Sequence, residues 1–368
     1  MLRIAVNTRL LIPDKLEGVG RFSVELLRRL VQNHPEVEFV FCFDRPFSPE
    51  FIFGPNVKGL VVNPPARHPF LYYYWFQHRL PKALETENID LFFSPDGHVP
   101  LKLKAKTLVA IHDLAFEHFA KGVDVLHQLY YKFFFLRFAR KATRLITVSD
   151  FSKADLVRTY QVNPEKIDVI HNGVSAVFKQ SEIKLADRIP YFIYVGAIHP
   201  RKNILNLLRA FEQFKTANAG LPHQMVLVSR SSWKTSQIAR YLKKMIHRTD
   251  VIFNKNLSDN ELNILLNNAT ALVYPSYFEG FGLPVIEAFA CGTPVITTKN
   301  TVMAEIAKGA AHLFEANNVD ELAELLFLQA SGAAQNAEKI KLGLTLVQNY
   351  SWDIAAEQLW QTIQKTLA

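Results

Sequence analysis

Two glutamates in one short segment carry the strongest chemical signal in the sequence. Glu279 and Glu287 enclose the run Gly-Phe-Gly-Leu-Pro at 280–284. A proline in the first helical turn marks a helix start, and backbone amides at that end of a helix bind anions. The amides that would hold a diphosphate here are those of Gly280, Phe281, Gly282 and Leu283. Ionised carboxylates accept hydrogen bonds from the paired hydroxyls of sugars and riboses, so the segment predicts a nucleotide-sugar site.

Arg201 and Lys202 could supply the positive charge that a diphosphate needs. They follow the apolar run 191–196 and precede a segment of helical pattern that begins at Asn203. Cations are electrostatically misplaced at a helix N-terminus unless an anion lies between them and the helix. We therefore expect both side chains to neutralise a leaving phosphate, with a solvated basic turn as the alternative.

Three residues of the first half are further candidates. His112 ends a predicted strand and lies beside Asp113, although a lone histidine at a strand end is often structural. Gly18 and Gly20 precede a predicted helix that begins at Arg21 and could bring amides against a phosphate or an acceptor. The third glycine of a dinucleotide fingerprint is missing, which argues against a dehydrogenase.

The segment from Glu279 to Glu287 resembles the signature of the family 4 glycosyltransferases. Other segments are similar to that family in the same order, namely 18–22, 111–113, 148–153, 170–174, 194–196 with 201–203, and 350–352. The resemblance covers nearly the whole chain. It implies a retaining enzyme of the GT-B fold, with Glu279 on the donor sugar, Glu287 on the ribose and His112 near the reacting carbon.

Two positions depart from the family's pattern. Ala197 stands where relatives often carry an arginine, and 229–232 reads Ser-Arg-Ser-Ser where they usually carry glycines. The first departure affects the number of cations that bind the diphosphate, and the second affects the shape of the nucleobase pocket. The sequence contains no Asp-x-Asp motif, the element that anchors a cation in the other large class of transferases. We therefore expect no metal and no cofactor. The resemblance then implies a front-face reaction in which the departing phosphate takes the acceptor proton.

The elements that must position these residues form a repeating pattern. Short runs rich in Val, Ile and Phe alternate with helical periodicity, which is typical of parallel sheets joined by helical crossovers. We predict strands near 4–7, 39–43, 60–63, 91–94, 108–112, 145–149, 168–171, 191–196, 224–229, 251–253, 271–274, 295–298 and 312–314. The fold class is therefore α/β, with two Rossmann-like domains facing a cleft. The domains span 1–180 and 189–350, and a C-terminal helix, 351–368, returns to the first.

Composition limits the classes of partner. The 368 residues include 42 Lys and Arg against 34 Asp and Glu, a net charge of +8 that favours anionic partners. Two cysteines and no signal-like or membrane-spanning segment predict a cytoplasmic protein. The aromatic, basic segments 68–76 and 127–141 would suit contact with an anionic membrane, which places the enzyme at the inner face of the plasma membrane. The alternative for the second segment is a helix buried on one face.

The predicted activity is transfer of a hexose from a UDP- or GDP-sugar to a glycan or lipid-linked acceptor. Cell-surface polysaccharide or glycolipid synthesis would use such a reaction, and nucleic acid is not an expected partner. The alternatives are a nucleotide-sugar epimerase and a non-catalytic partner in a polysaccharide assembly complex. We expect Glu279→Ala to abolish transfer and to leave the fold intact.

Overall fold

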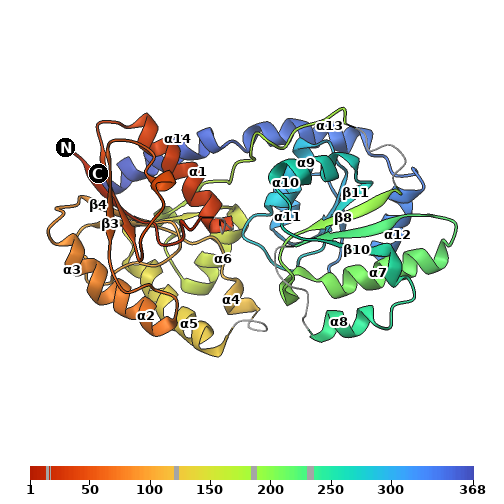
Figure 1. Ribbon diagram of the computed structural model, residues 1–368, viewed down its shortest axis with the longest axis horizontal. Coiled ribbons are helices and arrows are strands. Elements are labelled where there is room, and N and C mark those ends of the chain that lie inside the picture. The colour runs from red at the N-terminus through yellow and green to blue at the C-terminus, as the bar shows by residue number, and fades with distance from the viewer. Residues whose placement is uncertain (14–15, 17, 120–123, 184–188, 230–235) are drawn as a thin grey trace. The chain divides into compact units, whose positions relative to one another are not determined.

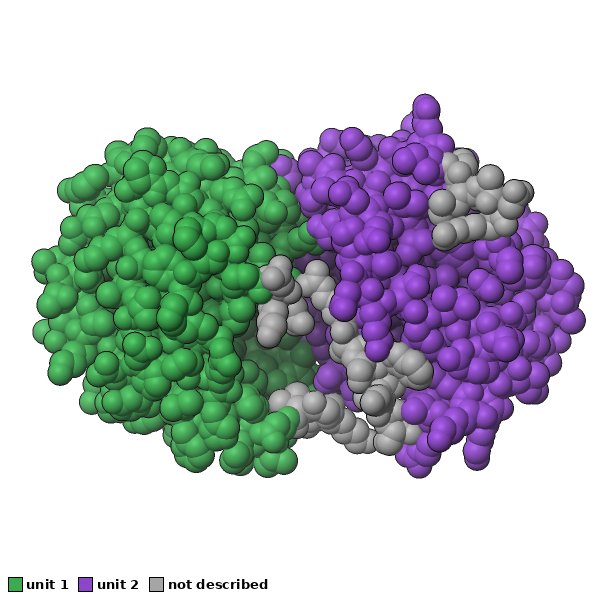
Figure 2. Space-filling model, in the orientation of Figure 1, with its two compact units in different colours: residues 1–173, 352–368 green, residues 174–351 purple. Residues whose placement is uncertain are grey.

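The protein forms two compact α/β units. The computed structural model describes residues 1–13, 16, 18–119, 124–183, 189–229 and 236–368. Unit 1 contains Met1–Gly173 and Trp352–Ala368, and unit 2 contains Val174–Ser351 (Figure 2). The second unit thus begins at Val174, ahead of the polar stretch 178–190 that separates the predicted domains. Each unit contains one parallel sheet, which confirms the predicted fold class.

The sheet of unit 1 has seven strands in the order β3-β2-β1-β4-β5-β6-β7, all parallel. Its strands are β1 (Arg3–Asn7), β2 (Glu38–Phe43), β3 (Val57–Val61), β4 (Leu91–Ser94), β5 (Lys106–Ala110), β6 (Arg144–Thr147) and β7 (Ile167–Val169). Ala5 of β1 lies between Val40 and Phe92 in the register, and all three are fully buried. The chain runs outward from β1 to β3 and then returns to β4, so the strand order reverses between β1 and β4.

Helices cover this sheet, and several begin with a cap that the sequence provides. The α-helices of unit 1 are α1 (Gly18–Asn33), α2 (Pro69–Tyr74), α3 (Leu80–Leu84), α4 (Ala115–His118), α5 (Val125–Lys141), α6 (Asp150–Tyr160) and α14 (Trp352–Leu367); a π-helical turn, η2 (Trp75–Arg79), links α2 to α3 (Figure 1). The Asp124 carboxylate accepts the amides of Leu126 and His127 at the start of α5. Such side-chain caps satisfy amides that have no partner within the helix.

Helix α14 completes unit 1 by packing on α1. The Arg29 guanidinium donates to Asp353 at 2.5 Å, and the rings of His34 and Trp360 stack with their centroids 3.7 Å apart. Phe22 of α1 also meets Trp352 edge-on at 6.4 Å. Residues from the two ends of the sequence therefore share one hydrophobic face.

The sheet of unit 2 has six parallel strands in the order β10-β9-β8-β11-β12-β13. Its strands are β8 (Tyr191–Val195), β9 (Gln224–Val228), β10 (Val251–Asn254), β11 (Ala271–Tyr274), β12 (Val295–Thr298) and β13 (His312–Phe314). Its helices are α7 (Ile204–Ala217), α8 (Ser236–Leu242), α9 (Asp259–Asn268), α10 (Leu283–Ala290), α11 (Val302–Ala307), α12 (Val319–Ala330) and α13 (Ala337–Leu346). Here the order reverses between β8 and β11.

Three local predictions are wrong in their boundaries. Strand β3 is Val57–Val61 and not 60–63. Helix α1 begins at Gly18, so Gly18 and Gly20 lie in its first turn and not ahead of it. Arg201 and Lys202 lie in a separate 3-10 turn, η4 (Pro200–Lys202), because Asn203 adopts a left-handed backbone conformation (φ 60°) that interrupts the helix.

Candidate functional site

The predicted cations and Glu279 meet at the switch point of unit 2. In open parallel sheets, ligands bind beyond the carboxyl ends of the strands where the strand order reverses. Arg201 and Lys202 follow β8, and Glu279 follows β11, the neighbour of β8 in the sheet. Residues that are far apart in the sequence are thus brought together at the place where this fold binds ligands.

The turn that carries the two cations is held by its flanking residues. The His199 side chain accepts the Arg201 amide, and the Asn203 amide group donates to the carbonyl oxygens of Pro275 and Ala316 at 3.1 and 2.7 Å. The Tyr277 amide in turn donates to the Arg201 carbonyl oxygen at 2.8 Å. These bonds fasten the turn to the loop after β11, which carries Glu279.

The Glu279 carboxylate lies between both cations. Arg201 donates to its Oε2 at 2.5 Å, and Lys202 forms an ion pair with its Oε1. Arg201 also donates to the carbonyl oxygen of Phe278 at 2.9 Å. Glu279 and Lys202 are only 6% and 7% exposed, so solvent screens this cluster little.

Charge and burial act in opposite directions on Glu279. Burial raises the pKa of this carboxyl group, but the positive charges of Lys202 and Arg201 outweigh it and lower the pKa to about 2. Glu279 is therefore ionised at neutral pH. Among the described side chains of this cluster, two cations face one carboxylate, and this balance would attract an anion such as a diphosphate.

Two tyrosines support the cluster from the strands beneath it. The Lys202 ammonium donates to the Tyr274 hydroxyl at 2.9 Å, and that hydroxyl donates to Glu279 at 3.2 Å. Tyr194 stacks on Tyr274 with a centroid distance of 6.1 Å and donates to the Ala197 carbonyl oxygen at 3.0 Å. Burial raises the pKa of both hydroxyls well above their ordinary value, so they act as neutral donors. Neither tyrosine belongs to the predicted site.

The glycine loop leads into α10 as the sequence predicts. Gly282 caps the helix with a φ of 112°, a conformation that side chains other than glycine rarely adopt. Leu283 is the first residue of α10 and Pro284 follows in its first turn, where backbone amides have no partner within the helix. Gly280 and Phe281 lie in the loop between Glu279 and this cap.

Glu287 lies within α10 and is buried, with 6% exposure. The helix thus carries the second carboxylate, and the loop before it carries the first, as the spacing of the pair predicts. The contact of Glu287 with a ribose stays a prediction. Of the segment 229–232, only Ser229 is described; it is buried at the end of β9, and Arg230, Ser231 and Ser232 lie outside the described residues.

His112 occupies a defined position after β5 in unit 1. Its Nε2 lies 2.8 Å from the Pro95 carbonyl oxygen, and its ring meets Phe22 edge-on at 4.7 Å. A carbonyl oxygen only accepts, so Nε2 carries the hydrogen and Nδ1 of the neutral ring can accept one. Burial lowers the pKa of His112, against the smaller opposing effect of the Pro95 carbonyl, and so favours the neutral ring. His112 is thus suited to accept a hydroxyl hydrogen.

Gly18 and Gly20 have different surroundings in the first turn of α1. A Cβ added at Gly18 would meet no atom of the described residues within 4 Å, whereas one at Gly20 would lie 3.3 Å from the Leu16 side chain and 3.4 Å from the Leu10 carbonyl oxygen. The open space at Gly18 would let a ligand approach the backbone there. The role of both glycines in donor binding stays a prediction.

The switch point of unit 1 holds a polar cluster that the sequence reasoning missed. Arg9 follows β1, and Asp96 and His98 follow β4. Arg9 donates to Asp96 at 2.7 Å and lies over the Tyr72 ring, 4.8 Å from its centroid. Burial raises the pKa of Asp96, but the opposing effects of Arg9 and His98 prevail and lower it far below its ordinary value. The rule that singled out His112, a polar residue after a buried strand, would also have found these residues.

His98 lies in a cage of aromatic rings. It is 2% exposed, stacks on Phe76 with a centroid distance of 4.8 Å, and has Tyr130 at 5.9 Å. Burial lowers the pKa of His98 despite the nearby Asp96, so the ring is neutral. Within the described part of the chain, the His98 Nε2 and the Tyr130 hydroxyl have no hydrogen-bond partner. The cluster therefore combines the Arg9–Asp96 ion pair with two polar atoms that form no hydrogen bond to the described residues.

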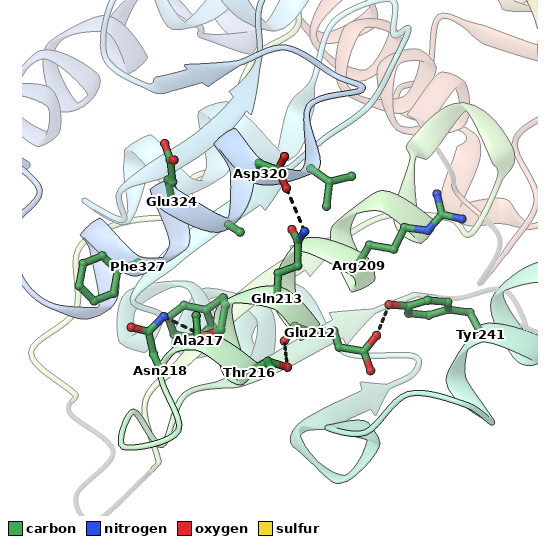
Figure 3. A pocket seen from close by; sticks show the side chains of 13 residues that line it. Arg209, Glu212, Gln213, Thr216, Ala217, Asn218, Tyr241, Asp320, Glu324 and Phe327 are labelled. Carbon is green, nitrogen blue, oxygen red and sulfur yellow. Dashed lines mark hydrogen bonds between the residues drawn. The ribbon is translucent and has the colours of Figure 1, made fainter.

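A large surface cavity lies elsewhere in unit 2. It has a volume of about 790 Å³ and is lined by residues of α7, α8 and α12, with Gln213 donating to Asp320 at 2.9 Å (Figure 3). Its charged lining residues are Arg209 and three acids, Glu212, Asp320 and Glu324. The negative excess disfavours a diphosphate, and none of the predicted site residues lines this cavity.

Two features are absent from the described part of the chain. No group of three or more His, Cys, Asp or Glu side chains could hold a metal ion there. None of the helices described is both long enough and apolar enough to cross a membrane. The predictions of a metal-independent reaction and of membrane contact therefore stay predictions.

Fold and site together define a class of protein with two α/β units, each built on one parallel sheet. The model named "Glycosyltransferase Family 4" matches residues 16–177, and the model named "Glycosyl transferases group 1" matches residues 177–329. The chain is therefore a glycosyltransferase that belongs to family 4. The two models meet near the boundary between the units, at Gly173 and Val174.

Similar proteins cover most of the chain. The O-antigen chain mannosyltransferase RfbU of Salmonella typhimurium is 28% identical over 303 residues, which are 80% of this chain and 82% of the relative. The O-antigen chain mannosyltransferase B of Escherichia coli is 23% identical over 367 residues, 93% and 94% of the two chains. Both are therefore similar in sequence across both units.

Solved structures share the fold at low sequence identity. Sucrose-phosphate synthase from Thermosynechococcus elongatus aligns with a TM-score of 0.79 and 20% identity over 99% of each chain. The Anabaena protein HepE in complex with UDP-glucose aligns with a TM-score of 0.74 and 16% identity, covering 99% of this chain and 100% of its own. These likenesses identify the architecture as GT-B.

Proposed function

We propose that this glycosyltransferase moves mannose from a nucleoside diphosphate sugar to a growing cell-surface polysaccharide, with retention at the anomeric carbon. The observation that carries the donor assignment is the Arg201–Glu279–Lys202 cluster at the switch point of unit 2. The names of the O-antigen mannosyltransferases support mannose and a polysaccharide acceptor. The UDP-glucose complex of HepE supports a nucleotide sugar as donor.

In this proposal the diphosphate exchanges partners with Glu279. The two cations that hold the carboxylate are the groups that a diphosphate needs, and together they exceed it by one charge. Phosphate oxygens would take over hydrogen bonds from Arg201 and Lys202, while the loop amides near Gly282 provide further donors. Glu279 would then turn its acceptor oxygens to hydroxyls of the sugar.

The reaction that we propose breaks the bond between the anomeric carbon and the β-phosphate oxygen. The acceptor hydroxyl oxygen forms its new bond on the same face, and its proton passes to the departing phosphate oxygen. Arg201 and Lys202 would stabilise the negative charge that develops on that phosphate. His112 would accept a sugar hydroxyl at Nδ1 and orient the ring, and unit 1 would bind the acceptor.

Donor binding and transfer test this proposal together. Purified protein should be stabilised against heat by a nucleoside diphosphate and its mannose ester, because a ligand that binds only the folded state raises stability by mass action. The isosteric variant Glu279→Gln should keep nucleoside diphosphate binding and lose at least 100-fold in transfer. Transfer by Glu279→Gln at the wild-type rate would refute the assignment of Glu279.

The structure changes one expectation about Glu279→Ala. Removing the carboxylate takes a counter-charge from Arg201 and from the buried Lys202, and breaking a buried ion pair costs about 3–5 kcal/mol. The melting temperature of this variant should therefore fall. A nucleoside diphosphate should restore part of it, because the anion takes the place of the missing carboxylate. A melting temperature equal to that of the wild type without ligand would contradict this account.

The same experiments separate the alternatives. An epimerase would convert the donor to an isomer without any acceptor, and a non-catalytic partner would neither hydrolyse nor transfer the sugar. We also propose that the reaction needs no metal, with phosphate charge met by Arg201, Lys202 and amides. Transfer that stops on addition of EDTA and returns with a divalent cation would overturn this part. We assign the enzyme to the cytoplasm, where nucleotide sugars are available.

A further inference from the structure

Large apolar side chains are exposed together on two helices of unit 1. Helix α2 exposes Phe70, Leu71, Tyr73 and Tyr74, and the first half of α5 exposes Val125, Leu126, Leu129 and Phe133. Phe70 is 71% exposed and Leu129 60%. We call these eight residues the α2–α5 face. Contiguous apolar surface of this kind marks an interaction site.

The two helices lie side by side and their exposed residues are linked. Figure 1 shows α2 and α5 as neighbours at the lower edge of unit 1, and they contact one another. The ring of Tyr73 on α2 lies 5.6 Å from that of Phe134 on α5, which in turn lies 4.9 Å from Phe133. Val125, Leu129 and Phe133 recur every four residues and so form one stripe along α5. The α2–α5 face is therefore one surface.

The opposite side of α5 is buried. Tyr130, Phe135 and Phe138 are at most 7% exposed and belong to the core of unit 1. The alternative for the segment 127–141, a helix buried on one face, is thus confirmed, and contact of its exposed face with a membrane stays a prediction. Because α5 is anchored through this core, its exposed face is presented on a rigid support.

The face lies within a basic part of the chain. The segments 66–83 and 125–144 together contain eight Lys and Arg and no Asp or Glu, as many positive charges as the net charge of the whole chain. Arg67, Lys132 and Arg140 are exposed, and the described residues include no ion partner for any of them. Arg137 lies over the Phe133 ring, 3.6 Å from its centroid. Apolar and cationic side chains are therefore interleaved on one surface.

We propose that the α2–α5 face docks on an anionic phospholipid bilayer. Aromatic rings and leucines on such a face enter the boundary between head groups and acyl chains, and Lys and Arg bind the lipid phosphates. A second copy of the chain fits this face poorly, because a symmetric dimer would place two mainly cationic surfaces against each other, with Asp124 at the start of α5 as an exposed acid beside them. The docking surface goes beyond the proposed reaction and does not depend on it.

Vesicle co-sedimentation of the full chain tests the proposal without donor or acceptor. The protein should bind vesicles that contain phosphatidylglycerol at least ten-fold more tightly than vesicles of phosphatidylcholine alone, and added salt should weaken the binding. Leu129→Ser with Phe133→Ser should reduce binding to anionic vesicles at least ten-fold. Lys132→Glu with Arg140→Glu should do the same. These side chains are exposed, so the variants should keep the wild-type melting temperature.

Matched controls separate the face from general surface properties. Ile246→Ser with Phe327→Ser removes two exposed apolar side chains from unit 2, and Lys102→Glu with Lys104→Glu makes the same charge change elsewhere on unit 1. Both control pairs should bind vesicles within two-fold of the wild type. No binding by the wild type, or equal loss in patch and control variants, would overturn the proposal. So would sedimentation equilibrium in which the wild type is dimeric and the Leu129→Ser, Phe133→Ser variant monomeric.

Discussion

The two switch points of the molecule carry similar residues with a different balance of charge. In unit 2, Arg201 and Lys202 share the single carboxylate of Glu279. In unit 1, Arg9 pairs with Asp96 and lies within the field of Asp44, while burial lowers the pKa of His98 and so favours the neutral ring. Among the described side chains, the first cluster therefore has two cations for one carboxylate, and the second pairs one cation with one carboxylate.

In our proposal, this difference distinguishes a cluster that binds an anionic ligand from an ion pair that supports the fold. A neutral buried pair has little to gain from an added anion, whereas a cluster with an excess cation gains a partner. The Asp96 carboxylate also receives hydrogen bonds from Asn7 and Ser94, at 2.7 and 3.1 Å. Its acceptor positions are thus occupied by residues of its own sheet, while those of Glu279 are occupied by the cations that a donor would use.

The largest effect on stability is expected in unit 1. Asp96→Asn leaves the Arg9 guanidinium buried without a counter-charge, which should lower the free energy of unfolding by about 3–5 kcal/mol. Urea unfolding followed by circular dichroism measures this loss. Glu38→Gln, which removes the partner of the half-exposed Arg3, is the control and should cost less than about 1 kcal/mol. Equal losses of unfolding free energy in the two variants would show that burial does not strengthen the contribution of the Arg9–Asp96 pair to stability.

The next effect is expected on activity, in unit 2. Lys202→Met removes the excess charge but leaves Arg201 to pair with Glu279, so kcat/KM should fall about 100- to 1000-fold. The loss of stability should be smaller than that of Asp96→Asn. Lys299→Met breaks an ion pair with Glu321 at a more exposed position and should keep wild-type kinetics. A Lys202→Met enzyme with wild-type kcat/KM would show that the second cation of the unit 2 cluster is not needed for activity.

Acid should weaken the Glu279 cluster within a defined range of pH. The pKa of Glu279 is lowered from its ordinary 4.5 to about 2. The stability that this pairing contributes, about 3 kcal/mol, is therefore complete above pH 4.5 and is lost as the pH falls towards 2. The difference in unfolding free energy between wild type and Glu279→Gln should shrink over that range. A difference that is constant from pH 7 to pH 3 would contradict the lowered pKa.

The smallest effect is expected from Tyr274, a positioning residue. Tyr274→Phe removes a hydroxyl that accepts from Lys202 and donates to Glu279, which should cost about 1 kcal/mol, or roughly five- to ten-fold in kcat/KM. The loss should appear mainly in KM for the donor, because the hydroxyl orients the groups that bind it. Tyr277→Phe, in the same loop, is the control. Equal kinetics in the two variants would argue against this positioning role.

Most of the fold could be predicted because buried strands have a clear sequence signature. Runs such as Phe39–Phe43 and 191–195 are apolar without interruption, as strands covered on both faces must be. Strand β3 was misplaced because Lys58 and Gly59 break its apolar run and its edge position leaves it partly exposed. The start of α1 was misplaced because Gly18 and Gly20 suggest a turn, although both have an ordinary helical backbone there.

The site could be predicted where a motif stands after a strand. Glu279, Glu287, Arg201 and Lys202 lie in such segments, and the structure brings Glu279 together with both cations. Arg9 and Asp96 also follow buried strands, β1 and β4, but their pairing could not be predicted, because those strands are neighbours only through the strand order. That order is a tertiary property, and no local pattern in the sequence encodes it.

The return of α14 to unit 1 has a consequence for biosynthesis. Unit 2 is one continuous segment, Val174–Ser351, and its two ends are joined by a hydrogen bond from the Val174 amide to the Tyr350 carbonyl oxygen at 2.8 Å. During translation the ribosome finishes this inserted segment before it makes Trp352–Ala368. Synthesis of unit 1 thus begins first, but this unit is the last to obtain its full core. Its helix α1 can be covered only after α14 has been made.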